Sequence, residues 1–328
     1  MGARLSLPDV ERARSVLARH LRETPLRESL AVPGADVRLK LECWQPTGSF
    51  KVRGATHLLA SLDGAERRRG VVAASAGNHA LGVAFAAARL GGDLPATLFV
   101  PRNAPRTKVE KLRRFPVDVR ETGETYDDAV EAAREFERRT GATFVHAFED
   151  PRTAAGQGTV ALEILDACPD ASAILVPVGG GGLIAGIATA AKARAPGVRI
   201  VAVQPSASPA LAESLRLGRA LLTYPAGPTL ADGLSGGIGE IAFDHRDLVD
   251  DVVTVSEEEI EDAMVALLAA DQVVAEASGA VGIAALRSGR VAGADRGPAV
   301  AVITGGNVDA RVLARLLAAR YPDAGVPR

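Results

Sequence analysis

The chain has 328 residues, a hydrophobic fraction of 47% and a formal net charge of −2. Its length exceeds that of most single domains, so we expect two domains and a large core. Binding to nucleic acid or to a membrane is disfavoured and a cytoplasmic protein is expected, because the charges are mixed, no apolar run is long enough to span a bilayer, and the first residues do not form a signal peptide.

Taken in chain order, short apolar runs that predict strands alternate with longer segments that predict helices. The predicted strands are residues 37–42, 71–74, 96–100, 143–147, 174–178, 200–203 and 299–303. The predicted helices include residues 83–90, 125–140, 185–195 and 257–270, the last with a capping box from Ser256 and Glu259. This alternation predicts an α/β fold with parallel sheets covered on both faces by helices.

The segment Pro46-Thr-Gly-Ser-Phe-Lys-Val-Arg-Gly-Ala55 contains Lys51, one of only five lysines among 38 lysines and arginines. An arginine stays protonated, whereas a buried lysine can lose its proton, attack a carbonyl and hold it as a Schiff base. Lys51 follows an aromatic residue, and Gly54 opens a predicted helix just after it. Lys51 is therefore a candidate cofactor anchor, and the alternative is a solvated surface lysine.

The segment Ser75-Ala-Gly-Asn-His-Ala-Leu-Gly82 follows a predicted strand and precedes a helix of small residues. Ser75 is expected to cap this helix, and Asn78 is expected near its first turn. The unpaired N–H groups and the positive end of the helix dipole favour an anion at that place. Alternatively, Asn78 and His79 serve only in capping and packing.

Glycines follow two later predicted strands. In Pro177-Val-Gly-Gly-Gly-Gly-Leu183, four glycines allow backbone amides to surround a phosphate, although the segment is neither a P-loop nor a dinucleotide fingerprint. In Ala301-Val-Ile-Thr-Gly-Gly-Asn-Val308, a strand ends in a hydroxyl and two glycines. The plainer alternatives are an ordinary turn for the first segment and an ordinary strand end for the second.

In this order, the four segments resemble the fold-type II pyridoxal-phosphate enzymes, most closely the serine/threonine dehydratases (threonine ammonia-lyases) and the related serine racemases. The resemblance runs from about Thr24 to about Leu317. It implies a tryptophan synthase β-subunit-like fold with twisted, mostly parallel sheets, corresponding to the catalytic domain only. A large pyridoxal-phosphate-binding domain would comprise residues 1–65 and 147–328, and a small domain, residues 66–146, would be inserted in it. A homodimer or higher homo-oligomer is expected.

The resemblance also implies roles for residues around pyridoxal 5′-phosphate, in the cleft between the domains. Lys51 would hold the cofactor as a Schiff base and remove the α-proton of an amino-acid substrate. Phe50 would pack on the pyridine ring, Asn78 would bind the 3′-oxygen, and Thr304 would face the pyridine nitrogen. The residues expected to bind the phosphate are Gly179, Gly180, Gly181 and Gly182. Those expected to bind the substrate carboxylate are Ser75, Ala76, Gly77, Asn78 and His79.

Thr304 predicts the type of reaction. A neutral hydroxyl at the ring nitrogen makes the ring a weaker electron sink than an Asp would, which favours β-elimination over transamination. The expected reaction removes water and then ammonia from an L-β-hydroxy amino acid, L-threonine or L-serine, to give a 2-oxo acid. Bulkier substrates, phenylserine-like or hydroxyectoine-derived, remain open. A catalytically silent relative that only binds the cofactor or a ligand is the alternative outside the enzymes.

Two departures from the serine racemases refine these expectations. At the position where the racemases have a second serine, this chain has Ala76, which carries no proton, so racemase activity is the disfavoured alternative. The racemases also bind a divalent cation through carboxylates, and the matching residues here are Gln204 and Ala210. Because hard cations prefer carboxylate oxygens, no metal is expected.

Overall fold

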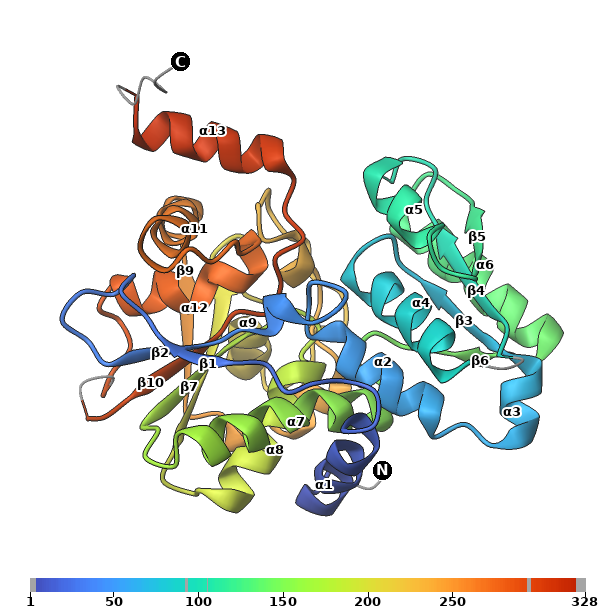
Figure 1. Cartoon of the computed structure of the whole chain (residues 1–328), viewed down its shortest axis with the longest axis horizontal. Helices are drawn as coiled ribbons and strands as arrows, with labels where there is room; N and C mark the ends of the chain where they lie inside the picture. The colour runs from blue at the N-terminus through green and yellow to red at the C-terminus, as the bar shows by residue number, and fades with distance from the viewer. Residues whose placement is uncertain (1–3, 92–93, 105, 294–295, 323–328) are drawn as a thin grey trace.

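The computed structural model describes residues 4–91, 94–104, 106–293 and 296–322, and its strands form two sheets (Figure 1). The larger sheet has the order β1 (Leu26–Glu28), β2 (Val37–Lys40), β10 (Ala299–Val302), β7 (Ala173–Pro177), β8 (Arg199–Pro205) and β9 (Asp251–Val255). The smaller sheet has the order β5 (Asp118–Glu121), β4 (Ala96–Val100), β3 (Val71–Ala74) and β6 (Thr143–Phe144). Strands β1 and β2 pair antiparallel and the other neighbours pair parallel, so the expected α/β fold is confirmed.

Helices cover both faces of the larger sheet (Figure 1). One face packs against α1 (Leu7–Leu17), α7 (Pro151–Ala167) and α8 (Gly182–Arg194). The other face packs against α11 (Glu257–Asp271), α12 (Ala277–Arg287) and α13 (Ala310–Arg320). In β7, Ile174 and Val176 point into the first core and Leu175 into the second. Burial on both faces explains why this strand is a continuous apolar run.

The smaller sheet is also covered on two sides. The helices between residues 64 and 140 are α3 (Gly64–Arg69), α4 (Asn78–Leu90), α5 (Arg106–Leu112) and α6 (Tyr126–Thr140). Helix α4 shares a core with Ala73 and Leu98, and α6 shares one with Val72 and Phe99 on the opposite face. All four strands lie between residues 71 and 144. The division of the chain into domains at residues 65/66 and 146/147 stays a prediction.

Helix α2 (Lys51–Ala60) lies between the two sheets and packs against α4 on one side and α7 on the other (Figure 1). Glycines make both contacts close. A Cβ on Gly82 of α4 would lie 3.0 Å from the carbonyl carbon of Lys51, and one on Gly156 of α7 would lie 2.7 Å from the Cα of Gly54. The start of α2 is therefore in direct contact with both halves of the structure.

Several elements differ from the sequence-based prediction. Helix α2 begins at Lys51 rather than at Gly54, and α4 begins at Asn78 rather than at residue 83. Strand β2 ends at Lys40, and the short helix η1 (Glu42–Trp44) follows it, whereas β6 stops at Phe144. The sequence analysis missed β1, β5 and β9, which lie at sheet edges. Strands β1 and β5 carry charged residues instead of apolar runs, whereas β9 (Asp-Val-Val-Thr-Val) has a strand-like sequence that the analysis did not use.

The remaining short elements are α9 (Ala210–Leu217), α10 (Glu240–Asp244), η2 (Asp232–Leu234) and η3 (Arg246–Leu248). Helix α11 begins with the expected capping box of Ser256 and Glu259. In the part of the chain that the structure describes, no helix has both the length and the apolar character needed to cross a membrane.

Candidate active site

The structure brings Lys51 next to Thr304. The N–H of Phe50 donates to the carbonyl oxygen of Thr304 at 3.0 Å, and Ser49 forms an isolated bridge with Gly305. The first residue of α2 therefore lies against the segment that follows β10. The Nζ of Lys51 lies 3.3 Å from the carbonyl oxygen of Ala147 and 5.1 Å from the centre of the Phe50 ring.

The Lys51 amine is suited to attack a carbonyl. Burial lowers the pKa of Lys51 to about 8, and the nearby carboxylate of Glu276 opposes part of this shift. An amine with an ordinary lysine pKa carries almost no neutral form at pH 7, whereas a pKa near 8 gives a substantial neutral fraction. Only the neutral amine is a nucleophile, so the environment of Lys51 favours Schiff-base chemistry.

The four glycines form the turn from β7 into α8. Gly181 has φ of 88°, in the left-handed region, and Gly182 is the first residue of a helix of 13 residues. A Cβ on Gly180 would lie 2.3 Å from Cδ1 of Phe148, and one on Gly179 would lie 2.7 Å from the carbonyl oxygen of Gly233. The backbone of this turn therefore leaves no room for side chains, and glycine is required. Its N–H groups lie at the N-terminus of α8, an arrangement that can bind a phosphate.

Two partners fix the orientation of the Asn78 amide. Its Oδ1 accepts from Nδ2 of Asn307 at 2.8 Å, and its Nδ2 donates to Oε1 of Glu276 at 2.7 Å. The second N–H on Nδ2 has no protein partner among the described residues. It can therefore donate to a ligand oxygen, as expected for the 3′-oxygen of the cofactor.

Glu276 is a site residue that the sequence analysis did not single out. Its N–H donates to the carbonyl oxygen of Gly305 at 3.0 Å, and a Cβ on Gly305 would lie 2.2 Å from its Oε1. Burial, together with the charge of Asp232, raises the pKa of Glu276 to about 7. The only signal in the sequence is the stretch Glu276-Ala-Ser-Gly-Ala-Val-Gly282, which lies within the part of the chain that resembles the family.

Thr304 is buried and neutral. Its hydroxyl donates to the carbonyl oxygen of Ser278 at the long distance of 3.3 Å, and only 2% of the residue is exposed. A hydroxyl can also donate to an unprotonated ring nitrogen, which is the role that the family resemblance implies for Thr304. That role stays a prediction.

The segment before α4 differs in part from expectation. Gly77, not Ser75, is the N-cap residue of α4, and the Ser75 hydroxyl accepts the N–H of Gly77 at 3.1 Å. The His79 ring lies in the core, where Nε2 is 2.8 Å from the carbonyl oxygen of Val145. The first-turn N–H groups of Asn78 and His79 remain at the helix start, and Ala76 is partly buried beside them.

Gln204, where the family resemblance led us to expect no metal, makes three hydrogen bonds within the protein. The Oε1 of Gln204 accepts from the N–H groups of Leu211 and Ala212 at 3.0 and 3.2 Å, and its Nε2 donates to the carbonyl oxygen of Val178 at 3.1 Å. The amide thus joins α9 to the residue before the glycine turn. Within residues 4–322, the described His, Cys, Asp and Glu side chains form no group of three that could hold a metal.

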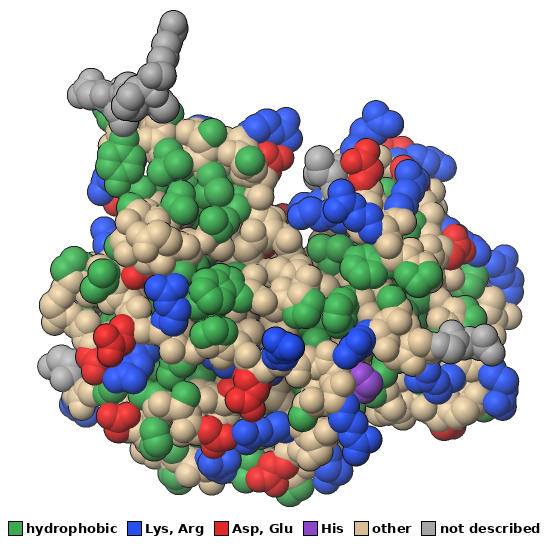
Figure 2. Space-filling model, viewed as in Figure 1, with side chains coloured by type: hydrophobic (Ala, Val, Ile, Leu, Met, Phe, Trp, Pro, Cys, Tyr) green, Lys and Arg blue, Asp and Glu red, His purple; other side chains and the backbone are tan. Residues whose placement is uncertain are grey.

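Two lysines of α5 reach across to η2 and to the segment that follows β10. The Nζ of Lys108 lies 3.4 Å from Oδ2 of Asp232, and the Nζ of Lys111 lies 3.4 Å from Oδ1 of Asn307. Figure 2 shows the surface hollowed between the two parts of the molecule, with Lys and Arg side chains on the rim over α5. Positive charge at this rim attracts anionic ligands.

The Lys51 amine can bind a carbonyl, and the glycine turn can bind a phosphate. Together they indicate an enzyme whose cofactor is a phosphorylated aldehyde. Residues 17–305 match the family described as pyridoxal-phosphate dependent enzyme. The chain belongs to this family, and its cofactor is pyridoxal 5′-phosphate.

Known proteins support this assignment over nearly the whole length. The chain is 44% identical to an L-threonine ammonia-lyase of Thermotoga maritima, over 95% of this chain and 78% of that protein. It is 37% identical to a serine racemase of Oryza sativa, over 95% of this chain and 94% of the relative. The solved structure of maize serine racemase superposes with a TM-score of 0.90 at 34% identity and covers 98% of this chain and 99% of the racemase chain.

Proposed function

We propose that this protein is a pyridoxal-phosphate-dependent ammonia-lyase that dehydrates L-threonine, L-serine or both and releases a 2-oxo acid and ammonia. The observation that carries the proposal is the neutral, buried Thr304 beside the start of α2, in a chain 44% identical to an L-threonine ammonia-lyase. Pyridoxal phosphate, when bound, withdraws electron density from the α-carbon of an amino acid. A hydroxyl rather than a carboxylate at its ring nitrogen favours elimination.

The proposed cofactor-binding residues each contribute one kind of contact. Lys51 holds the cofactor through its amine, and Phe50 packs beside it. The backbone N–H groups of residues 179–182 bind the phosphate, with the N-terminal dipole of α8 behind them. Asn78 donates its remaining N–H to the 3′-oxygen, and the Thr304 hydroxyl faces the ring nitrogen.

The proposed substrate contacts lie at the start of α4. The N–H groups of Asn78 and His79 bind the substrate carboxylate, and Ser75 supports this turn through its bond to Gly77. Lys51, with a pKa of about 8, accepts the α-proton near neutral pH. Loss of the β-hydroxyl as water follows, and hydrolysis then gives the 2-oxo acid and ammonia.

A racemase would need a proton donor on the face of the substrate opposite Lys51. Ala76 lies in the segment where the racemases place a second serine, and a methyl group has no proton to give. Serine racemase activity is therefore the second candidate, supported by the relatives of that name at 37% identity and disfavoured by Ala76.

The test is incubation of the holoenzyme with L-threonine, L-serine, their D-isomers and bulkier β-hydroxy amino acids, followed by measurement of 2-oxo acid, ammonia and chirality. We expect 2-oxobutanoate from L-threonine and pyruvate from L-serine, with almost no D-isomer and no turnover by Lys51→Ala. D-serine formed as fast as pyruvate would contradict the proposal. If only the bulky β-hydroxy amino acids were turned over, the proposed substrate would be wrong but the proposed reaction would stand. If no amino acid were turned over, the protein would be a binding protein rather than an enzyme.

The proposal extends to the compartment, the oligomeric state and the domain division of the enzyme. We infer a cytoplasmic homodimer or higher homo-oligomer with a small domain at residues 66–146, as the family resemblance implies. Sedimentation analysis of the holoenzyme tests the oligomeric state, and a monomer at micromolar concentration would contradict it.

A further inference from the structure

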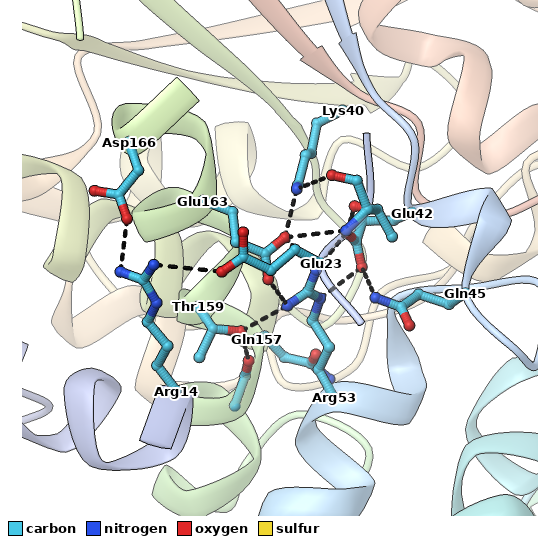
Figure 3. Close-up of polar contacts among 12 residues, drawn as sticks. Arg14, Glu23, Lys40, Glu42, Gln45, Arg53, Gln157, Thr159, Glu163 and Asp166 are labelled. Atoms are coloured by element: carbon cyan, nitrogen blue, oxygen red, sulfur yellow. Dashed lines mark hydrogen bonds and ion pairs between the residues drawn. The ribbon is translucent and has the colours of Figure 1, made fainter. Parts of the chain in front are cut away.

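A buried network of ion pairs includes Arg53, in the first turn of α2 (Figure 3). Its members are Lys40 of β2, Glu42 of η1, Arg53 of α2 and Glu163 of α7. At most 5% of any of these side chains is exposed. Two positive and two negative groups face one another, so the network is neutral as a whole.

Arg53 uses all five of its N–H donors. Its Nε and Nη2 donate to the two carboxylate oxygens of Glu42 at 2.7 and 2.8 Å. Its Nη1 and Nη2 donate to the two oxygens of Glu163 at 2.5 and 2.7 Å, and Nη1 also donates to Oγ1 of Thr159 at 3.0 Å. The planar guanidinium is thus held in a two-pronged contact on both sides, which a lysine ammonium cannot reproduce.

Further partners complete the network. Lys40 donates to Glu163 and to the carbonyl oxygen of Thr24, the latter at 2.7 Å. The hydroxyl of Thr24 and the side-chain amide of Gln45 donate to Glu42. Four charged groups buried in this way rarely stabilise a fold more than apolar residues of the same volume would, because desolvation offsets their attraction. The useful property of such a network is its fixed geometry.

The geometry bears on Lys51. Arg53 lies two positions after Lys51, about 200° around an α-helix, so the two side chains leave opposite sides of the first turn. The other contacts of this turn are mainly between backbone surfaces: Gly54 meets Gly156, and Gly82 meets the backbone of Lys51. One further directed contact is long, from the N–H of Gly54 to Oε1 of Gln157 at 3.3 Å. Backbone surfaces without side chains limit the distance between helices but do not fix rotation or sliding, whereas five directed hydrogen bonds fix both.

We propose that Arg53, held by Glu42 and Glu163, is a positioning residue that sets the rotation and axial position of α2 and thereby aims the Lys51 amine at the cofactor. The inference rests on the proposed role of Lys51. Glu42, in η1 directly after β2, connects α2 to the larger sheet, and Glu163 connects it to α7, so the position of Lys51 is fixed relative to the glycine turn that follows β7 of the same sheet.

The test variant is Arg53→Lys, which keeps the positive charge but loses the planar guanidinium and its paired N–H donors. The control is Leu162→Ala, which removes a fully buried side chain from the helix that carries Glu163. The full chain is titrated with pyridoxal phosphate by absorbance, and kcat, KM and Tm are measured with L-threonine. For Arg53→Lys we expect the Kd of the cofactor to rise and kcat to fall by about tenfold or more, with KM changed less than about threefold. Leu162→Ala lowers Tm but leaves Kd and kcat within about twofold.

A charge-balanced double variant keeps the test possible if Arg53→Lys does not fold. Lys40→Met with Glu163→Gln removes one charge of each sign and leaves the pair of Arg53 with Glu42. It is expected to fold and to shift Kd and kcat in the same direction by at least about threefold. Wild-type Kd and kcat in either network variant, with only Tm lowered, would overturn the positioning role. Failure of the Lys51 assignment would show differently, as a wild-type protein whose cofactor is not bound to Lys51.

Discussion

Replacement of His79 by Gln tests the packing of the segment that begins α4. The His79 ring is 5% exposed and its Nε2 lies 2.8 Å from the carbonyl oxygen of Val145. Burial, and to a lesser degree the charge of Lys51, lowers the pKa of His79 to about 3 from an ordinary value of 6.5. The ring is therefore neutral in the folded protein at any pH above about 4, and Gln keeps a donor for Val145 without the titration.

The sign of the effect follows from proton binding. Between pH 6.5 and 3 the unfolded chain binds a proton at His79 and the folded chain does not, so acid favours unfolding. The stability contributed by this depressed pKa is complete above pH 6.5 and is lost as the pH falls. Linkage with these two pKa values gives a loss of about 2 kcal/mol at pH 5 and about 3 kcal/mol at pH 4.

The assay is urea unfolding of wild type and His79→Gln between pH 7.5 and 4, with the cofactor at the same saturating concentration. We expect the difference in unfolding free energy between the two proteins to narrow by about 2 kcal/mol from pH 7.5 to pH 5. Burial also lowers the pKa of His146, to about 4, but this group is present in both proteins and cancels. His20→Gln, at a partly exposed histidine, is the control. A difference independent of pH would refute the buried, neutral His79.

Three further changes test other parts of the account. Gly180→Ala places a methyl group 2.3 Å from Cδ1 of Phe148 and should weaken cofactor binding at least about tenfold in an absorbance titration; an unchanged Kd would contradict the phosphate-binding role. A chelator should leave Tm and turnover unchanged because the Gln204 amide bonds α9 and Val178, and a loss restored by magnesium would show a cation site. Glu276→Gln should lessen the fall in stability from pH 5 to 8, because the raised pKa of Glu276 stabilises the fold only while the group is protonated; an unaltered pH profile would argue against that pKa.

The buried parallel strands could be predicted from the sequence because their chemistry is local. Strands β3 and β7 are continuous apolar runs and β4 is interrupted only by Thr97, and the structure buries every residue of each strand. The edge strand β5 (Asp-Val-Arg-Glu) could not be predicted, since it is rich in charge and depends on pairing with β4. Strand β9 (Asp-Val-Val-Thr-Val) carries a local strand signal that the sequence analysis did not use. The predicted starts of α4 and α8 fall after the observed ones, because the early glycines of these helices are weak helix formers.

The site residues divide in the same way. Lys51, the glycine turn and Thr304 stand out in local motifs. The structure places the Lys51 segment against the Thr304 segment, and Lys51 contacts Ala147 while Gly180 lies against Phe148. Glu276 contacts Asn78 across 198 positions of the chain, so no local pattern predicts it. Arg53 lies inside the Lys51 motif, yet its partner Glu163 is 110 positions away, and only the fold shows that the arginine is buried and fully paired.

The most direct test of the central claim is to locate the cofactor in the chain. Borohydride reduction of the holoenzyme fixes a Schiff base as a stable amine, and mass spectrometry of the peptides then identifies the modified residue. We predict one pyridoxyl phosphate per chain, on Lys51. A label on Lys40, Lys108, Lys111 or Lys192 instead, or no label on any lysine, would contradict the assignment of Lys51 and the mechanism built on it.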